Sequence, residues 1–420
     1  MLEQRQPQFV EVPLLQALGR VLAEPVLADR DFPPFPRATR DGYAIRSADL
    51  TSDGTASLRV VGQVKAGDSY DLPLSSGEAV EIMTGAGVPQ GADAVVMVEY
   101  TERKSSPKTR PAREKAQSQD LLELDDSGTS DETALSEHED LVEIQRAVNA
   151  GENVVPAGAE AKAGQKLLAP GVRLGPAQIA LAAAAGKASI KVFRKPRIAV
   201  LSTGDELVDV VEKPGPGQIR NSNSYSLAAE VAAAGGEPVQ LPIAPDEQGK
   251  LTELVEEGLK ADMLLLSGGV SMGKFDLVET VLKALGAEFF FTGAMIQPGK
   301  PVVFGTARDI PFFGLPGNPV SVMVTFGLFA RQVVEALSGA EPSRLRSAQA
   351  RLKKEFKAKT GLTRFLPAMI QGELYDAAVE VVPWQGSGDL LAAALANCYL
   401  VVPPDREKLA RGEMVTVVLR

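Results

Sequence analysis

From about residue 195 the chain alternates short apolar runs, small-residue loops and helix-like segments. The runs PRIAVLS and ADMLLLS are almost continuously apolar, and a loop and then a helix-like segment follow each of them. Strands that are apolar throughout are typical of a parallel sheet covered by helices on both faces. The pattern therefore predicts a doubly wound α/β domain over residues 193–342.

Three loops of this domain are candidates for ligand binding. In doubly wound domains, ligands bind beyond the carboxyl ends of the strands, where TGDE, SGGVSMG and GLPGNPVS would project. The small residues of SGGVSMG (267–273) allow close approach of a phosphate, although a plain tight turn explains them equally well. Asp276 follows closely enough to reach a ligand held there.

The other loops also allow two interpretations each. Asp205 and Glu206 could hold a hydrated Mg²⁺ or orient a hydroxyl, but Thr203 or Asp205 could instead cap a helix. In GLPGNPVS a helix follows a strand directly, so free backbone N–H groups suit an oxyanion, with a structural turn as the alternative. Lys300, in QPGKP, offers a fixed cation, although most exposed lysines have no such role.

The flanking regions are β-rich. Short β-like runs such as LRVVGQV and ADAVVMVEY lie within residues 29–155, and a further β-rich unit follows from about residue 343. The stretch VPLLQALGRVLAEPV (12–26) has apolar residues at helical spacing, which predicts a short amphipathic helix. Residues 103–140 are basic and then acidic and serine-rich, so we expect a disordered insertion that includes His138.

Composition restricts the chemistry and the location. One cysteine and one histidine exclude an internal disulfide and an imidazole metal site, which favours Mg²⁺ over zinc. Residues 120–143 hold ten acidic residues and no Lys or Arg, equal to the net charge of −10, so an anionic substrate remains possible. No apolar run approaches 18 residues and no signal peptide is evident, so we expect a cytoplasmic protein.

In this order and spacing, the motifs DGYA, IMTGA, GADAVV, LSTGDEL, SGGVSMG, PGKP, GLPGNPVS and GSG resemble the molybdopterin molybdenumtransferase family. The resemblance covers nearly the whole chain outside residues 103–140. It implies a homodimer of four-domain subunits with the active site between subunits. The implied domains are a discontinuous linking domain (1–28 and 156–192), a mostly β domain (29–155), a molybdopterin-binding α/β domain (193–342) and a C-terminal β-barrel (343–420).

The resemblance also implies roles for individual residues. Asp276, Glu206 and Asp41 would be catalytic, and Asp205, Glu206 and Asp276 would hold the metal. The residues implied to bind the pterin substrate are Thr84, Ser267, Gly268, Gly269, Ser271, Asp246, Pro316 and Pro319. Molybdate would be bound by Lys300, Ser321, Arg364 and Ser387. Gln297 departs from the family pattern, where lysine is frequent at that position.

The implied reaction is insertion of molybdate into adenylated molybdopterin with release of AMP, and it requires Mg²⁺. Implied partners are the two substrates, a second copy of the chain and a molybdopterin adenylyltransferase, with no nucleic acid and no membrane. Two alternatives stay open. One is adenylation of molybdopterin by ATP, because adenylyltransferases resemble the same α/β domain. The other is a scaffold, because an animal homologue also clusters membrane receptors.

Overall fold

The structure is a computed structural model that describes residues 8–68, 70–107, 138–269, 277–373 and 375–420. The chain divides into two compact units, one of Val26–Leu167 and one that combines Met1–Pro25 with Leu168–Arg420. The multidomain α/β and β fold class expected from the sequence is confirmed.

A six-stranded sheet forms the centre of the α/β domain. Its order is β16 (Glu237–Gln240), β13 (Arg197–Ser202), β17 (Met263–Ser267), β21 (Ile310–Leu315), β20 (Val303–Ala307) and β18 (Glu288–Phe291). The first four strands are parallel, as expected, but β20 runs antiparallel to β21, and β18 pairs antiparallel with β20. The reversal has a local cause. The two residues between β20 and β21, Arg308 and Asp309, both have positive φ, which is the backbone of a tight two-residue hairpin.

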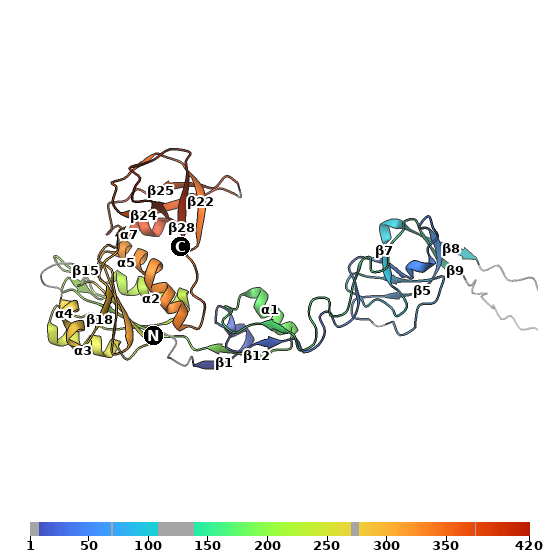
Figure 1. The fold of residues 1–420 in the computed structure, drawn as a ribbon, viewed down its shortest axis with the longest axis horizontal. Coiled ribbons are helices and arrows are strands. Elements are labelled where there is room, and N and C mark those ends of the chain that lie inside the picture. The colour runs from blue at the N-terminus through green and yellow to red at the C-terminus, as the bar shows by residue number, and fades with distance from the viewer. Residues whose placement is uncertain (1–7, 69, 108–137, 270–276, 374) are drawn as a thin grey trace, which may run out of the picture. The chain divides into compact units, whose positions relative to one another are not determined.

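Helices cover both faces of this sheet (Figure 1). The helices α3 (Gln248–Gly258) and α4 (Leu277–Ala284) lie on one face; α2 (Ser222–Ala234), α5 (Pro319–Thr325), a π-helical turn (Phe326–Ala330) and α6 (Arg331–Leu337) lie on the other. Alternate residues of β13 face opposite layers, because Leu201 packs with the α3 and α4 cluster and Val200 with the α2 and α6 cluster. The prediction of a sheet covered on both faces is confirmed.

One helix of the described chain, Pro319–Leu337, is long and apolar enough to cross a membrane by length and composition. Half of the most apolar stretch of this helix is buried inside the domain. Val322, Phe326, Ala330 and Val334 of this helix pack against the sheet. Its apolar character is therefore explained by its place in the core.

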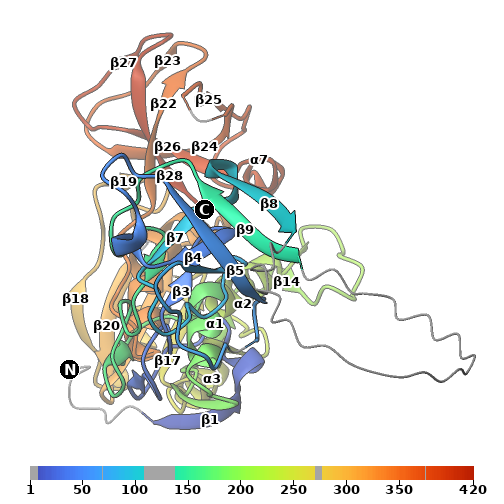
Figure 2. The same cartoon turned by 90° about the vertical axis from the view of Figure 1, so that its right-hand side faces the viewer.

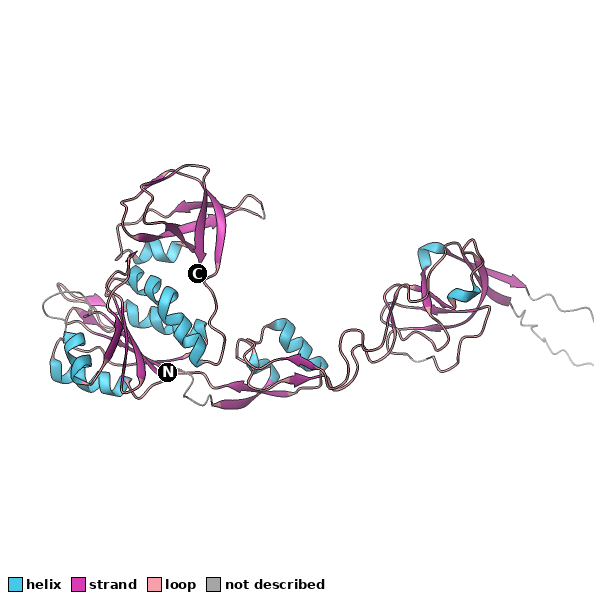
Figure 3. Cartoon of the chain, viewed as in Figure 1, coloured by secondary structure: helices cyan, strands magenta, loops and turns pink. Residues whose placement is uncertain are grey.

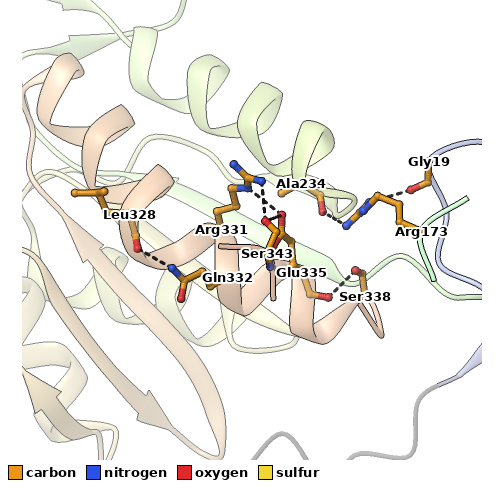
Figure 4. Close-up of polar contacts among 9 residues, drawn as sticks. All are labelled: Gly19, Arg173, Ala234, Leu328, Arg331, Gln332, Glu335, Ser338 and Ser343. Carbon is orange, nitrogen blue, oxygen red and sulfur yellow. Dashed lines mark hydrogen bonds and ion pairs between the residues drawn. The ribbon is translucent and has the colours of Figure 1, made fainter. Parts of the chain in front are cut away.

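A buried carboxylate fixes the end of this helix (Figure 4). Glu335 is 4% exposed and accepts hydrogen bonds from the Ser343 backbone N–H at 2.7 Å, the Ser343 hydroxyl at 3.0 Å and Arg331 Nε at 2.9 Å. Burial alone would raise the pKa of Glu335, but the bonds from Ser343 and Arg331 outweigh it and leave the pKa below its usual value. Glu335 thus joins α6 to the segment that leads into the C-terminal domain.

The C-terminal domain is a closed barrel of five strands, which confirms the expected barrel (Figures 2 and 3). The strands β24 (Thr363–Gln371), β25 (Ala378–Val381), β22 (Ser347–Leu352), β28 (Met414–Leu419) and β26 (Cys398–Val402) pair in that order, and β24 also pairs with β26. The short helix α7 (Leu390–Leu395) precedes β26, and β23 (Phe356–Lys357) pairs with β27 (Lys408–Leu409). The strand β19 (Ile296–Gln297) of the α/β region extends β24.

The two ends of the predicted linking domain meet in an antiparallel pair, β1 (Phe9–Pro13) with β12 (Ser189–Phe193), near helix α1 (Pro176–Ala184). The predicted amphipathic helix over residues 12–26 is wrong, because only one 3₁₀ turn forms, at Leu14–Ala17. Gly19, with φ of +75°, ends the turn, and Leu22 then pairs with Val192 as a bridge. The apolar periodicity of this stretch reflects packing of extended chain rather than a helix.

The unit Val26–Leu167 is built on a six-stranded sheet. Its order is β7 (Ala94–Met97), β4 (Gly42–Ile45), β6 (Glu78–Ile82), β5 (Ala56–Val64), β9 (His138–Ile144) and β8 (Thr101–Pro107). Four short strands come before or after this sheet in the sequence. They are β2 (Val26–Leu27) and β3 (Arg37–Ala38), which precede it, and β10 (Val154–Val155) and β11 (Lys166–Leu168), which follow it.

The predicted disordered insertion over 103–140 is wrong at both ends. Residues up to Pro107 belong to β8, and His138 begins β9, so the part of the insertion outside the described residues is 108–137. Opposite charges explain how such polar segments pair, since Arg103 contacts Asp140 at 2.5 Å and Lys104 contacts Glu143 at 2.7 Å across the two strands.

Candidate functional site

Three parallel strands end at the same level of the α/β sheet. Ser202 is paired in register with Ser267, and Ser267 with Leu315. The next strand of this sheet along the chain, β16, lies on one side of β13, whereas β17 lies on the other. Beyond such a reversal of strand order, the loops diverge and leave room for a ligand. The loops after Ser202, Ser267 and Leu315 therefore begin side by side at this point.

Two glycines of the second loop have no room for a side chain, Gly268 because of the backbone of the first loop and Gly269 because of the Val278 side chain on α4. Gly268 has φ of +91°, and a Cβ there would lie 2.5 Å from the Thr203 carbonyl oxygen. A Cβ on Gly269 would lie 2.7 Å from Val278. Gly317 is the neighbour on the other side, because its own Cβ would be 3.7 Å from Gly268 Cα. Glycine at 268 is thus required for the three loops to pack together.

Hydrogen bonds join Asp205 of the first loop to Asp246 of the loop after β16. The Thr203 hydroxyl donates to Asp246 Oδ1 at 3.1 Å, and the Asp246 N–H donates to Asp205 Oδ1 at 3.0 Å. The Glu206 carboxylate lies over Gly204, where a Cβ would be 2.5 Å from its Oε2. Asp205, Glu206 and Asp246 are all exposed. These contacts present a set of acidic oxygens to the solvent side of the loop.

Neither Thr203 nor Asp205 caps the helix that follows, so this alternative is wrong. The next helix, α2, begins at Ser222 and is capped by Asn221, whose side chain accepts a hydrogen bond from the Ser224 N–H at 3.1 Å. Within the described ranges no group of three or more His, Cys, Asp or Glu could hold a metal ion, and Asp276 lies outside those ranges. Two carboxylates with substrate oxygens and water nevertheless match the usual Mg²⁺ environment.

The predicted oxyanion loop is tied to the C-terminal barrel. Asn318 Nδ2 donates to Ser387 Oγ at 2.9 Å, and the Val320 N–H donates to the Ser387 carbonyl at 3.0 Å. The expectation that the N–H groups of this loop are free is therefore wrong for Val320. Ser321 follows in α5 and is only 3% exposed. Ser387 therefore lies beside this loop, and its role in molybdate binding stays a prediction.

Lys300 follows β19, and Arg364 lies near the start of β24, the strand that pairs with β19. Lys300 is exposed and follows Gly299, where φ is +106° and a Cβ would lie 2.4 Å from Thr325. Arg364 pairs in register with Gln297 and donates to the Gln297 side-chain oxygen and to the Lys359 carbonyl at 3.0 Å. Gln297 thus accepts a hydrogen bond from Arg364, which a lysine at 297 could not do.

Sequence reasoning missed Asn223. Its side-chain N–H donates to Ser267 Oγ at 2.9 Å and to the Gly317 carbonyl at 2.7 Å, so it joins the second and third loops from the first turn of α2. The string Asn221-Ser222-Asn223 after a strand was a usable signal, because such residues favour helix starts. Nothing in the sequence shows which loops Asn223 reaches.

In the other unit, Asp41 and Thr84 contact each other. The Thr84 N–H donates to Asp41 Oδ1 at 2.6 Å, and this bond, with a further one from the Thr84 hydroxyl, holds the pKa of Asp41 below its usual value. Both side chains are exposed. Asp41 is therefore an ionised carboxylate at neutral pH, fixed next to a hydroxyl.

Comparison with known proteins agrees with this architecture along the whole chain. Residues 1–186 match the MoeA N-terminal region (domain I and II), residues 199–336 a "probable molybdopterin binding domain", and residues 349–419 the MoeA C-terminal region (domain IV). The molybdopterin molybdenumtransferase of Bacillus subtilis is 32% identical over 99% of this chain and 91% of its own length. The chain belongs to the molybdopterin molybdenumtransferase family.

Other members of the family agree in sequence and in fold. The molybdopterin molybdenumtransferase of a Nostoc species is 36% identical over 78% of this chain and 69% of its own length. A crystal structure of the molybdopterin biosynthesis MoeA protein from Pyrococcus horikoshii matches with a TM-score of 0.74 and 29% identity, over 98% of this chain and 95% of that protein.

The predicted site residues are divided between the two compact units. One unit holds Asp205, Glu206, Asp246, Ser267, Gly268, Gly269, Lys300, Pro316, Pro319, Ser321, Arg364 and Ser387, and the other holds Asp41 and Thr84. Asp276 and Ser271 lie outside the described residues. The roles of all these residues stay predictions.

Proposed function

We propose that this protein inserts molybdate into adenylated molybdopterin and releases AMP, which forms molybdenum cofactor. The observation that carries the proposal is the edge where Ser202, Ser267 and Leu315 end level and three loops pack through Gly268. The names of the relatives support the substrate class, since they are called molybdopterin molybdenumtransferases.

The pyrophosphate of the substrate would bind over Ser267, Gly268, Gly269 and Ser271. Backbone N–H groups in a glycine loop after a strand suit phosphate oxygens. Asp246, Pro316 and Pro319 border the same edge. Asp205, Glu206 and Asp276 would hold Mg²⁺, which when bound neutralises charge on the pyrophosphate while water cleaves it to release AMP.

Molybdate would dock on Lys300 and Ser321, with Arg364 and Ser387 supplying a second oxyanion position from the barrel. The dithiolene sulfurs of the substrate bond to molybdenum, and a molybdate oxygen leaves as water with the thiol protons. The substrate brings its own nucleophiles, so the protein acts mainly by positioning the reactants and balancing their charge.

We also propose a homodimer in which Asp41 and Thr84 of one copy complete the site of the other. Mixing Asp41→Asn and Asp276→Asn variants, with exchange of subunits, should restore about a quarter of wild-type activity, because half of the dimers then hold one intact site. Activity that stays at the level of the separate variants would contradict a shared site.

We place the protein in the cytoplasm, with a molybdopterin adenylyltransferase as the supplier of its substrate and with no membrane or nucleic-acid partner.

The direct test is AMP release from adenylated molybdopterin with Mg²⁺ and molybdate. We expect release by the wild type to depend on molybdate and to be lost in Asp276→Asn, while Glu253→Gln, on the exposed side of α3, behaves as the wild type. Molybdopterin and ATP serve as the second substrate pair. Turnover of that pair alone would favour the adenylation alternative, and no turnover of either would favour a scaffold.

Lys300→Gln should raise the KM for molybdate by roughly 10–100-fold with a smaller change in kcat, because a charge-assisted hydrogen bond contributes about 1.5–3 kcal/mol. Lys250→Gln is the matched control, since Lys250 is exposed on α3 and pairs with Glu247. An unchanged KM in Lys300→Gln would remove Lys300 from the molybdate site.

A further inference from the structure

A cavity of about 290 Å³ lies between the α/β domain and the C-terminal barrel, away from the site described above. It is walled by apolar side chains of the π-helical turn and the barrel, among them Phe326, Leu328 and Phe365. None of the proposed site residues lines it. Glu230, which does, is seven residues beyond Asn223 on α2, or roughly 10 Å along the helix.

Two polar groups of this cavity are buried without a partner. Glu230 Oε2 and the Tyr399 hydroxyl are both shielded from solvent and make no hydrogen bond. Tyr399 as a whole is only 7% exposed. Buried polar groups in native proteins are nearly always hydrogen-bonded, so two orphans in one cavity point to a ligand that would satisfy them.

The same cavity holds the Arg420 guanidinium, whose hydrogen bonds within the described residues go to neutral groups. The Arg420 guanidinium lies 5.6 Å from the Tyr399 ring centre and donates to the carbonyls of Ala393 and Ala396 and to the Met323 sulfur. These partners are all neutral. Arg331 also lines the cavity and is paired with Glu335. Arg346, next to the first strand of the barrel, lines the cavity as well.

The backbone that walls the cavity departs from a regular helix. Residues Phe326–Ala330 form a π-helical turn inside a helix that is otherwise α-helical, a feature that is rare and frequently found at functional sites. Gly327 lies in this turn, and a Cβ there would meet no atom within 4 Å. The turn and the missing side chain together leave the space open.

We propose that this cavity binds a small organic carboxylate with an apolar tail. The carboxylate would accept hydrogen bonds from Tyr399 and Glu230 and balance the charge of Arg420, and the tail would lie against Phe326, Leu328 and Phe365. This ligand satisfies both groups that lack a hydrogen bond and adds an anion beside Arg420, whose hydrogen-bond partners among the described residues are neutral. An ammonium ligand would lie beside Arg420, and a neutral ligand would leave that charge unbalanced.

The protonation of Glu230 agrees with this assignment. Burial raises the pKa of Glu230 to about 8, against a smaller opposing effect of Arg420, so at neutral pH its carboxyl carries a proton that it can donate. Burial also raises the pKa of Tyr399, to about 12, which keeps its hydroxyl a donor. Arg331 and Arg346 are the other charged side chains that line the cavity.

A pH series without ligand tests the state of Glu230. A carboxyl whose folded pKa is raised favours the folded state below its unfolded value, near 4.5, and loses that contribution as pH rises toward about 8. Glu230→Gln should therefore raise Tm above pH 8 by several degrees and change it little at pH 4. Equal Tm differences at both pH values would show that Glu230 is ionised when folded.

The ligand itself is tested by titration calorimetry of the full chain with octanoate, 1-octanol and octylamine. We expect saturable 1:1 binding of octanoate alone, weakened at least 10-fold by Arg420→Gln and abolished by Gly327→Leu, which fills the cavity. In the wild type the affinity should fall as pH rises through about 8, whereas Glu230→Gln, which keeps a donor, should show no such fall.

Glu253→Gln is the matched surface control, and a wild-type rate of AMP release by Gly327→Leu would show that the variant is folded. The proposal is overturned if octanoate shows no saturable binding, as when a second copy covers the cavity. It is also overturned if octylamine binds as tightly as octanoate, or if Gly327→Leu binds octanoate like the wild type.

Discussion

Gly268→Ala is expected to lower molybdate-dependent AMP release by about 100-fold or more. The new Cβ would lie 2.5 Å from the Thr203 carbonyl oxygen, a backbone atom that cannot rotate away, so the second loop must move relative to the first. A shift of about 1 Å in a positioning loop can cost on the order of 100-fold in rate. The assay is the same AMP release measurement, made at saturating molybdate.

The matched control for this variant is Gly286→Ala. Gly286 also has positive φ, +78°, but a Cβ there would meet no atom within 4 Å. Both variants carry the backbone cost of alanine at positive φ, roughly 1 kcal/mol, and only Gly268→Ala disturbs the loops. Near wild-type activity in Gly268→Ala, or an equal loss in Gly286→Ala, would contradict the role given to this close approach.

Glu335→Ala is expected to lower the free energy of unfolding by about 3–5 kcal/mol, because it removes a buried carboxylate and leaves the partly buried Arg331 without its anion. It also removes two hydrogen bonds to Ser343. Urea unfolding followed by circular dichroism at pH 7 measures the change. Glu335→Gln, which keeps the shape and part of the bonding, should lose less.

The control for Glu335 is an exposed pair of similar geometry. Arg308 contacts Glu256 at 2.6 Å with both side chains exposed, so Glu256→Ala should cost only about 0–1 kcal/mol. If the two alanine variants are equally stable, the network around Glu335 does not hold α6 to the segment that follows it.

The central sheet could be predicted from sequence because burial on both faces requires apolar residues at every position of a strand. Ile198 through Leu201 and Met263 through Leu266 meet that requirement, and every one of these residues is at most 1% exposed. The antiparallel edge was not predicted, since it depends on the positive φ values of Arg308 and Asp309, and neither residue type signals a hairpin strongly.

Sequence reasoning failed where tertiary contacts override local preference. Residues 12–26 have helical spacing but are drawn into pairing with residues 189–193, which lie far away in sequence. Residues 101–107 and 138–144 read as polar, yet cross-strand ion pairs and the buried Val142 and Ile144 make them strands. In both places the secondary structure is determined by the segment that pairs with these residues and not by their own sequence pattern.

The candidate site was predictable only in part for the same reason. Small residues after apolar strands pointed to Ser267, Gly268 and Gly269, and the motif order pointed to Ser387. Asn223 was missed, because its two partners lie 44 and 94 residues away and only the fold brings them together. The hydrogen bond from the Val320 N–H to the barrel was unexpected for the same cause.

The most direct test of the account is molybdenum insertion itself. The full chain is incubated with adenylated molybdopterin, Mg²⁺ and molybdate, and the product is given to a molybdenum enzyme prepared without its cofactor. We predict that the recipient enzyme becomes active only when both molybdate and the wild-type chain are present, and that Gly268→Ala gives almost none of this activity. A recipient that stays inactive, although wild-type protein and both substrates were present, would contradict the proposed transfer of molybdenum.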